Sequence, residues 1–234
     1  MKALLVRTLS PDLSGVELAE IERPDGEVLV RVREASLNYP DLLMTQGKYQ
    51  FKPDPPFVSG LEMAGEVIEA PADSGFLPGD RVRGGAKTGA FAEYVALSAS
   101  TLRKIPDGLD YSTAAAMGAA YHTAYVALIE IGGLEAGQSV LIHGASGGVG
   151  LAACDLARAL GAKVIAATHR EDKIEPIRRI AQPDAVILNT GRFREDISDL
   201  THGRLCDLVY DPVGGDVFDE STRCVTFGGK LLVI

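Results

Sequence analysis

A glycine-rich turn between an apolar strand and an alanine-rich helix is the feature that most constrains this chain. The segment reads SVLIHGASGGVGLAACDLARALGAKVIAAT, and Gly144, Gly147 and Gly150 are spaced as GxxGxxG. Glycines in this context allow a tight turn, close approach of the backbone to a pyrophosphate and close packing of helix on strand. The pattern predicts a dinucleotide site with phosphates at the N–H groups of Gly148, Val149 and Gly150. The alternative is a tight structural turn without a ligand.

The end of the next strand, about twenty residues after the turn, is where cofactor choice is expected. An acidic residue there would hold the ribose 2′-OH of NAD, but the chain has His169 and Arg170 instead. Arg170, with Lys173 one turn further on, can hold a 2′-phosphate by charge-assisted hydrogen bonds, which favours NADPH. In the alternative interpretation these cations are solvated helix residues paired with Glu171 or Asp172.

The chain changes character near residue 115, which predicts two domains, 1–115 and 116–234. The first half reads as short strands and turns at the spacing of a compact β-rich barrel. The second half alternates strands with helices, which is typical of a parallel α/β domain. The expected strands are 3–7, 28–34, 64–69, 81–83 and 89–97, followed by 140–143, 164–167, 185–188, 208–210 and 230–234.

The last of these strands ends the sequence. A full dinucleotide fold has six strands in the order 3-2-1-4-5-6, and only five are expected after residue 140. We therefore expect a second domain that is truncated after its fifth strand, with an apolar edge strand prone to aggregation or to pairing with another chain.

Composition excludes several partner classes. The formal net charge is -9 and the basic residues are scattered, which argues against nucleic acid and anionic membrane partners. The alanine-rich stretch 113–131 is interrupted by polar residues, so it predicts a buried helical region rather than a membrane span. Cys154, Cys206 and Cys224 are too few for a disulfide framework and suggest reduced thiols in the cytoplasm, and no export signal precedes them.

Several further motifs occur in a characteristic order. They are NYPDLLMTQGKY at 38–49, SGLEMAGEV at 59–67, GAFAEYVAL at 89–97 and AAAMGAAYHTAYVAL at 114–128. With the glycine turn, they resemble the medium-chain dehydrogenase/reductase superfamily, in its quinone oxidoreductase or zeta-crystallin-like branch. The resemblance implies an α/β protein with an N-terminal GroES-like catalytic domain, a C-terminal Rossmann domain, and NADPH in the cleft between them. In complete relatives the edge strand often builds a homodimer, so the resemblance implies a homodimer that a missing edge strand would weaken.

The zinc ligands of the superfamily's alcohol dehydrogenases are not matched. Asn38 stands at the position of a zinc cysteine, and Leu61 stands at that of the histidine before the glutamate matched by Glu62. Leucine cannot ligate zinc, and the stretch 71–88 has no cysteine for a structural zinc lobe. The resemblance therefore implies a mechanism without a metal.

Three polar residues are the candidate catalytic groups. Asn38, Asp41 and Tyr49 match polar positions that line the substrate cleft in similar quinone oxidoreductases. We expect the Asn38 amide to donate to a substrate carbonyl, Tyr49 to donate to it or to hold a water, and Asp41 to orient these groups. Leu43 replaces a second tyrosine found in some members. Asn-Tyr-Pro-Asp is also an ordinary turn, in which both acid and amide would bond to the local backbone.

Two more residues are candidates on the cofactor side. The resemblance places Thr123 near the nicotinamide, with an N-cap role at a helix start as the alternative. Val213 follows the fourth Rossmann strand at the carboxyl edge, where ligands bind in such sheets, and is expected to pack on the cofactor. His143 and Cys154 are interpreted as core residues.

These observations lead to one main functional hypothesis and two alternatives. The main hypothesis is hydride transfer from NADPH to a quinone or an α,β-unsaturated carbonyl. The first alternative is an enoyl-thioester reductase, since conjugate reduction needs the same hydride delivery and carbonyl polarisation. The second is a truncated, non-catalytic protein that binds NADPH.

Overall fold

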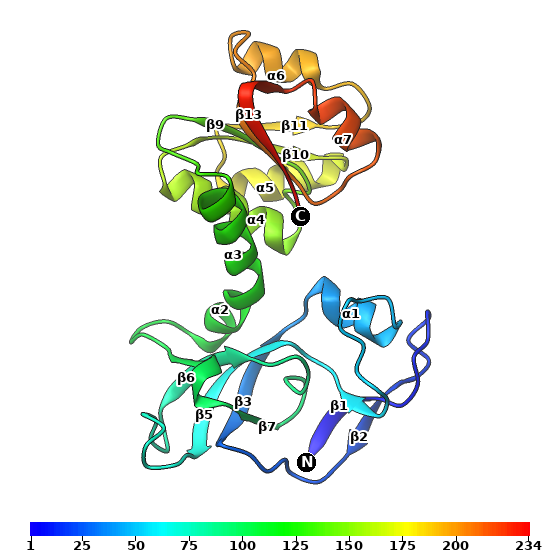
Figure 1. Cartoon of the computed structure of the whole chain (residues 1–234), viewed down its shortest axis with the longest axis vertical. Coiled ribbons are helices and arrows are strands. Elements are labelled where there is room, and N and C mark those ends of the chain that lie inside the picture. Colours follow the sequence, from blue (N-terminus) through cyan, green and yellow to red (C-terminus); the bar gives the residue numbers. More distant parts are fainter. The chain divides into compact units, whose positions relative to one another are not determined.

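The computed structural model describes all 234 residues, which form two compact units, Met1–Ala119 and Ala120–Ile234 (Figure 1). Helix α2 (Tyr111–Ala116) packs on strands of the first unit. The division between the units therefore lies after this helix, whereas the boundary expected at residue 115 falls within the helix.

The first unit contains two antiparallel sheets. The larger sheet has the strand order β7-β3-β5-β6-β8, and the smaller has the order β2-β1-β4. The strands are β1 (Lys2–Val6), β2 (Val16–Glu20), β3 (Val28–Ser36), β4 (Phe57–Val58), β5 (Glu62–Glu69), β6 (Arg81–Gly85), β7 (Tyr94–Leu97) and β8 (Leu102–Lys104), and the helical segments are α1 (Tyr39–Thr45), η1 (Ala99–Thr101) and α2.

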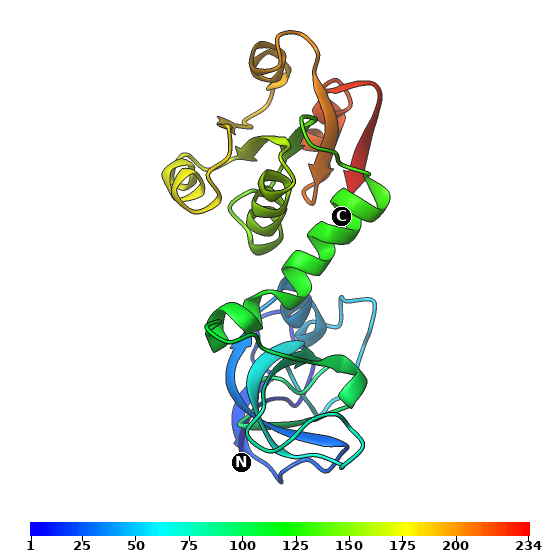
Figure 2. The ribbon, with the colours of Figure 1, turned by 90° about the vertical axis from the view of Figure 1, so that its left-hand side faces the viewer.

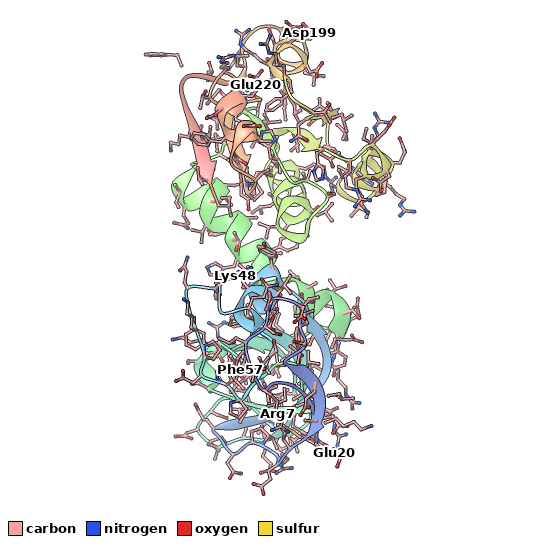
Figure 3. All side chains as sticks on the ribbon, turned by 90° about the vertical axis from the view of Figure 1, so that its right-hand side faces the viewer. Arg7, Glu20, Lys48, Phe57, Asp199 and Glu220 are labelled. Carbon is pink, nitrogen blue, oxygen red and sulfur yellow. The ribbon has the colours of Figure 1, made fainter.

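The core of this unit follows from alternating apolar residues. Val28 and Val30 of β3 face one buried cluster that also holds Val67 and Val82 from neighbouring strands. Irregular pairing between β3 and β5 curves the sheet around that cluster. Phe57 lies in a second buried cluster beneath the smaller sheet, inside the unit in Figure 3.

Three short strands of the first unit were not expected from the sequence, and one expected strand is shorter. β2, β4 and β8 have between two and five residues, too few for a clear alternating pattern. The expected strand over 89–97 is reduced to β7, since 89–93 form no continuous strand and Gly89 has a positive φ of 109°.

The second unit is a parallel sheet with helices on both faces, which confirms the predicted Rossmann-like architecture. Its strand order is β11-β10-β9-β12-β13, which is 3-2-1-4-5 in chain order. The strands are β9 (Ser139–Ile142), β10 (Lys163–Thr168), β11 (Ala185–Leu188), β12 (Cys206–Asp211) and β13 (Val225–Val233). Helix α3 (Gly118–Tyr125) begins with the last two residues of the first unit and continues into the second. The other helical segments of the second unit are η2 (Val126–Ile131), α4 (Gly148–Ala159), η3 (Glu171–Lys173), α5 (Ile174–Ala181), α6 (Arg194–Leu200) and α7 (Asp216–Ser221).

Successive residues of the central strand point to opposite faces of this sheet. Val140 and Ile142 join a buried cluster with residues of α4 and α5, whereas Leu141 joins a second cluster with Ile197 of α6. Figures 1 and 2 show the sheet between these helices. Because both faces are covered, the strands read as apolar runs rather than alternating patterns. β13 lies at one edge of the sheet, with Phe227 fully exposed.

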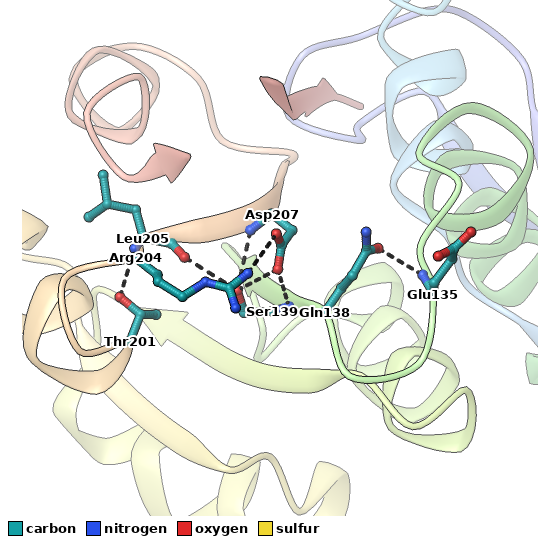
Figure 4. Close-up of polar contacts among 7 residues, drawn as sticks. All are labelled: Glu135, Gln138, Ser139, Thr201, Arg204, Leu205 and Asp207. Carbon is teal, nitrogen blue, oxygen red and sulfur yellow. Dashed lines mark hydrogen bonds and ion pairs between the residues drawn. The ribbon is translucent and has the colours of Figure 1, made fainter. Parts of the chain in front are cut away.

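The amino ends of β9 and β12 are joined by a polar contact that sets their register. Asp207 Oδ2 accepts from the Ser139 N–H at 2.8 Å and from Ser139 Oγ at 3.0 Å (Figure 4). The opposite, carboxyl ends of the same strands carry the glycine turn and the loop after β12. None of the helices in the chain has both the length and the apolar character that a membrane crossing needs.

Candidate functional site

The glycine turn follows β9 directly, and two of its glycines have measurable reasons to lack a side chain. Gly144 has φ of 59°, in the left-handed region that favours glycine. A Cβ on Gly150 would lie 2.2 Å from the carbonyl oxygen of Gly144, because the first turn of α4 packs directly on the turn. The local sequence therefore requires glycine at both positions for backbone reasons.

The start of α4 presents free backbone donors. Gly147 is the N-cap residue, has no side chain to cap the helix, and donates its own N–H to Gly144 O at 2.9 Å. The N–H groups of Gly148, Val149 and Gly150 make no hydrogen bond within the protein, as expected for the first turn of a helix. A Cβ on Gly148 would meet nothing within 4 Å. Free donors, the helix dipole and open space together fit a pyrophosphate.

The loop after β12 lies beside the glycine turn. Asp211 is buried at the end of the strand, and its Oδ1 accepts from the N–H groups of Val213 at 2.8 Å and Gly214 at 3.0 Å. A Cβ on Gly144 would lie 3.7 Å from the side chain of Val213. Val213 is exposed, so the fold brings an apolar side chain to the edge of the turn.

The residues expected to choose the cofactor lie after β10. His169 and Arg170 are exposed, and Lys173 is the N-cap residue of α5. The Arg170 guanidinium makes a two-point pair with Asp172, with Nε–Oδ1 at 2.9 Å and Nη2–Oδ2 at 2.7 Å. This pair lowers the pKa of the Asp172 carboxyl. The alternative interpretation, in which Arg170 pairs with Asp172, is thus present in the structure. A 2′-phosphate would have to compete with Asp172 for the guanidinium.

A buried polar cluster supports the carboxyl edge of this sheet. His143, the residue between β9 and the glycine turn, is completely buried. Its Nε2 lies 2.8 Å from Ser221 Oγ of α7, and its Nδ1 lies 3.1 Å from the amide nitrogen of Asn189, which follows β11. The ring also packs edge-on against Phe193 at 5.2 Å. One side chain thus joins three elements of the unit.

The hydrogen bonds of Ser221 fix the tautomer of His143. Ser221 Oγ donates its hydrogen to the Val217 carbonyl at 2.6 Å, so it can only accept from His143 Nε2–H. Nδ1 is then the acceptor for Asn189. Burial lowers the pKa of His143 to about 4, against the opposing charge of Asp211. His143 is therefore a neutral structural residue, and its partners Asn189 and Ser221 had no signal in the sequence.

In the first unit, Asn38 and Asp41 are in direct contact at the start of α1. Asn38 is the N-cap residue, and its backbone N–H donates to Asp41 Oδ2 at 2.8 Å. Asp41 is buried and its other oxygen has no partner. Burial raises the pKa of Asp41, and the charge of nearby Glu62 raises it further, although the Asn38 N–H acts in the opposite direction.

Glu62, the first residue of β5, completes this cluster. Its Oε1 accepts from Asn38 Nδ2 at 2.7 Å, and its Oε2 accepts from the backbone N–H of Ala119 at 2.7 Å. A Cβ on Gly118 would lie 2.0 Å from Oε2, so this contact requires glycine there. From the sequence, Glu62 was recognised only as a match to the family's glutamate and was not predicted to hold Asn38. Its signal is an acidic residue at the start of the strand EMAGEVIE, whose first four residues are all buried.

Two other candidates make no hydrogen bond to this cluster. Tyr49 is half-buried and packs against Val6, Met44 and Phe57, without a hydrogen bond to Asn38 or Asp41. Thr123 lies inside α3, five residues after its first residue, so the N-cap alternative for its hydroxyl was wrong. No hydrogen bond places either hydroxyl in a relay.

Metal-binding residue types do not gather anywhere in the chain. No three His, Cys, Asp or Glu side chains are close enough together to hold a metal ion. Cys154, Cys206 and Cys224 are free thiols in the core of the second unit, and burial raises the pKa of each to about 12.

Comparisons with known proteins agree with this architecture. Residues 24–107 match the family described as alcohol dehydrogenase GroES-like domain, and residues 148–234 match the family described as zinc-binding dehydrogenase. The quinone oxidoreductase of Thermus thermophilus, solved also in complex with NADPH, has a TM-score of 0.84 and 31% identity, covering 99% of this chain and 72% of that one. The chain belongs to the quinone oxidoreductase branch of the medium-chain dehydrogenase/reductase superfamily.

Two curated relatives that are similar to this chain differ greatly from it in length. Quinone oxidoreductase-like protein 2 homolog of Nematostella vectensis is 36% identical over 211 residues, which are 89% of this chain and 58% of the relative. Erythronolide synthase EryA2 of Saccharopolyspora erythraea is 41% identical over 215 residues, which are 90% of this chain and 6% of that protein. The chain thus spans little more than half of the first relative and matches a small segment of the second.

Proposed function

We propose that this chain carries an NADPH site and the acceptor-side residues for reduction of a quinone or an α,β-unsaturated carbonyl. The observation that carries the proposal is the glycine turn, whose free N–H groups, open surface and neighbouring Val213 suit a dinucleotide. Membership of the quinone oxidoreductase branch supports the reaction class. The chain spans only 58% of the length of the Nematostella vectensis relative. The activity of the whole protein is therefore proposed as well.

Three groups of residues are proposed to bind three different parts of the dinucleotide. Gly144, Gly147, Gly148, Val149 and Gly150 hold the pyrophosphate through backbone donors and close packing. His169, Arg170 and Lys173 receive the 2′-phosphate, with Arg170 exchanging its contact to Asp172 for the ligand. Val213 and Thr123 contact the nicotinamide half. NADPH supplies the hydride when bound.

The proposed acceptor residues are Asn38, Asp41 and Tyr49. The Tyr49 hydroxyl makes no bond to the other two and is the proposed donor to the substrate carbonyl. Asp41 orients the Asn38 backbone through its N–H, as expected for a supporting rather than a proton-donating carboxyl. The reaction then depends on positioning and hydrogen bonding without a metal.

A second acceptor class is an enoyl thioester. It stays a candidate because conjugate reduction of a thioester requires the same hydride delivery and the same polarisation of a carbonyl. A non-catalytic NADPH-binding protein is the third candidate. The buried free thiols suit a reducing compartment, so the cytoplasm is the proposed location, and a homodimer stays a prediction.

Titration with NADPH and NADH, followed by cofactor fluorescence, tests the binding step. Addition of 1,4-benzoquinone or an enoyl thioester, followed by loss of NADPH absorbance, tests the reaction. We expect tighter NADPH than NADH binding and faster oxidation with the quinone. Faster oxidation with the thioester would favour the second candidate, binding without oxidation the third, and absence of NADPH binding would contradict the proposal.

A further inference from the structure

Asp41 and Glu62 are two buried carboxyl groups that meet at one residue, Asn38. Asp41 is 1% exposed and accepts from the Asn38 backbone N–H at 2.8 Å. Glu62 is 5% exposed and accepts from Asn38 Nδ2 at 2.7 Å. The Asn38 side chain in turn accepts from the backbone N–H of Asp41, which completes a capping box. The two acids are therefore held close together with almost no access to water.

No cationic group balances these two acids. Neither carboxyl takes part in any ion pair of the chain. The charge that acts on Asp41 is that of Glu62, and its polar neighbours are the backbone groups of Asn38 and Leu61. Tyr49 is the titratable residue packed on the apolar side of the same helix, and it makes no hydrogen bond to Asp41. Two uncompensated negative charges in a sealed site would be costly.

The hydrogen bonds show which oxygen of the pair can carry a proton. Glu62 Oε1 and Oε2 each accept an N–H at 2.7 Å, from Asn38 and Ala119. Asp41 Oδ2 also accepts an N–H, but its Oδ1 is sealed from water and has no partner. An unpartnered hydroxyl costs much less to bury than an unpartnered charge, so a proton belongs on Oδ1. Burial and, to a smaller extent, the charge of Glu62 raise the pKa of Asp41, in agreement with this assignment.

We propose that Asp41 and Glu62 share one proton at neutral pH, held on Asp41 Oδ1, so that the acceptor side of the site carries one negative charge instead of two. Hydride transfer to a conjugated carbonyl puts negative charge on the carbonyl oxygen, and a second carboxylate nearby would oppose that charge. Asp41 is thus a positioning residue that limits the charge of the cluster and keeps its own proton. This consequence for the acceptor rests on the proposed function, whereas the shared proton does not.

Infrared spectroscopy detects the shared proton directly. A protonated carboxyl group absorbs above the amide I band, and labelling with 4-¹³C-aspartate shifts the band of an aspartic acid but not that of a glutamic acid. We expect the wild type at pH 7 to show a label-sensitive band that is missing from Asp41→Asn. Asp80→Asn is the matched control and should keep the band, because Asp80 lies in the same unit and pairs with Lys104.

Glu62→Gln tests the pairing of the two acids, and it also serves if Asp41→Asn does not fold. Glutamine keeps the side-chain volume and an acceptor for the Ala119 N–H, but it has no charge. Without repulsion by Glu62, we expect the pH midpoint at which the Asp41 band disappears to fall by about one unit. Glu66→Gln should leave the midpoint unchanged, because Glu66 lies in the same strand and pairs with Arg33 at the surface.

The pH dependence of turnover gives the functional readout. We expect kcat to fall by about tenfold as the pH rises through the raised pKa of Asp41, because the ionised carboxylate then opposes the charge on the acceptor oxygen. KM for NADPH should not change over the same range, since the glycine turn belongs to the other unit. Asp41→Asn should lack this alkaline fall in kcat, and Asp80→Asn should keep it.

The outcomes separate this inference from the proposed function. Absence of the band in wild type at pH 7, its survival in Asp41→Asn, or an unchanged midpoint in a folded Glu62→Gln variant would overturn the shared proton. The same alkaline fall in kcat in Asp41→Asn and in wild type would overturn its effect on the acceptor. Absence of NADPH oxidation by the wild-type chain would instead overturn the proposed function, while the infrared readout, which requires no turnover, still decides the shared proton.

Discussion

Each unit supports its candidate residues with a buried polar cluster, but the first cluster is built on carboxylates and the second on a neutral histidine. In the first unit, two carboxylates, Asp41 and Glu62, hold Asn38, and their hydrogen-bond donors are an amide and backbone N–H groups. In the second unit, His143 is held neutral between an amide and a hydroxyl. The first cluster orients a side chain, whereas the second supports a turn whose donors all belong to the backbone.

This difference predicts how each unit responds to change. A site made of backbone donors is sensitive to added Cβ atoms and tolerant of many charge changes nearby. A site built on a side chain held by carboxylates is sensitive to the hydrogen-bonding character of those groups. The following predictions test the comparison.

The largest effect is expected from Gly150→Ala in the second unit. Its Cβ would lie 2.2 Å from backbone at Gly144, so the turn or the helix must shift, at a cost of about 3 kcal/mol or more in the free energy of unfolding. Urea denaturation measures this. Gly148→Ala is the matched control, since its Cβ meets nothing within 4 Å, and an equal loss in both variants would contradict the packing argument.

Acid should destabilise the second unit through His143. Its pKa is about 4 in the folded protein and about 6.5 unfolded, so the stabilisation is complete above pH 6.5 and is lost as the pH falls towards 4. The loss corresponds to roughly 3 kcal/mol. Denaturation from pH 7 to pH 4 should show a weaker dependence in His143→Gln than in wild type, whereas the exposed control His169→Gln should keep the full dependence.

Gly118→Ala should have a smaller effect, confined to the first unit's cluster. The added Cβ would lie 2.0 Å from Glu62 Oε2, a side-chain atom that can move away, so the cost is the lost hydrogen bonds, about 2 kcal/mol. A double-mutant cycle with Glu62→Ala measures the coupling by urea denaturation. The substitution should cost much less in the Glu62→Ala background, and an equal cost in both would mean that helix α3, not Glu62, requires the glycine.

The smallest effect is expected at the exposed pair of Arg170 and Asp172. Asp172→Asn frees the guanidinium and should tighten NADPH binding by about threefold, in keeping with the weakness of surface pairs. NADH binding, measured by the same fluorescence titration, should not change. Glu175→Gln is the control, because Glu175 pairs with Arg178 instead. Equal tightening for both cofactors would contradict a role of Arg170 at the 2′-phosphate.

Much of the fold could be predicted because its signals are local. The glycine spacing around Gly144 reflects contacts within a few residues, and apolar runs marked all five strands of the parallel sheet. Short strands such as β4, with two residues, had no pattern to find. The helix around Thr123 was expected to begin closer to it, because no capping residue precedes Gly118 to mark the true start.

The sequence by itself determined the family, the order of the two units and the glycine turn, since each depends on neighbours along the chain. Only the tertiary structure decided which polar groups meet. Glu62 reaches Asn38 and Ala119, and His143 reaches Asn189 and Ser221, over separations of 24 to 78 residues. A residue's type states which hydrogen bonds it can make, but the packing of strands and helices selects the partner. The partner fixes the tautomer of His143 and directs the Asn38 Nδ2 towards Glu62.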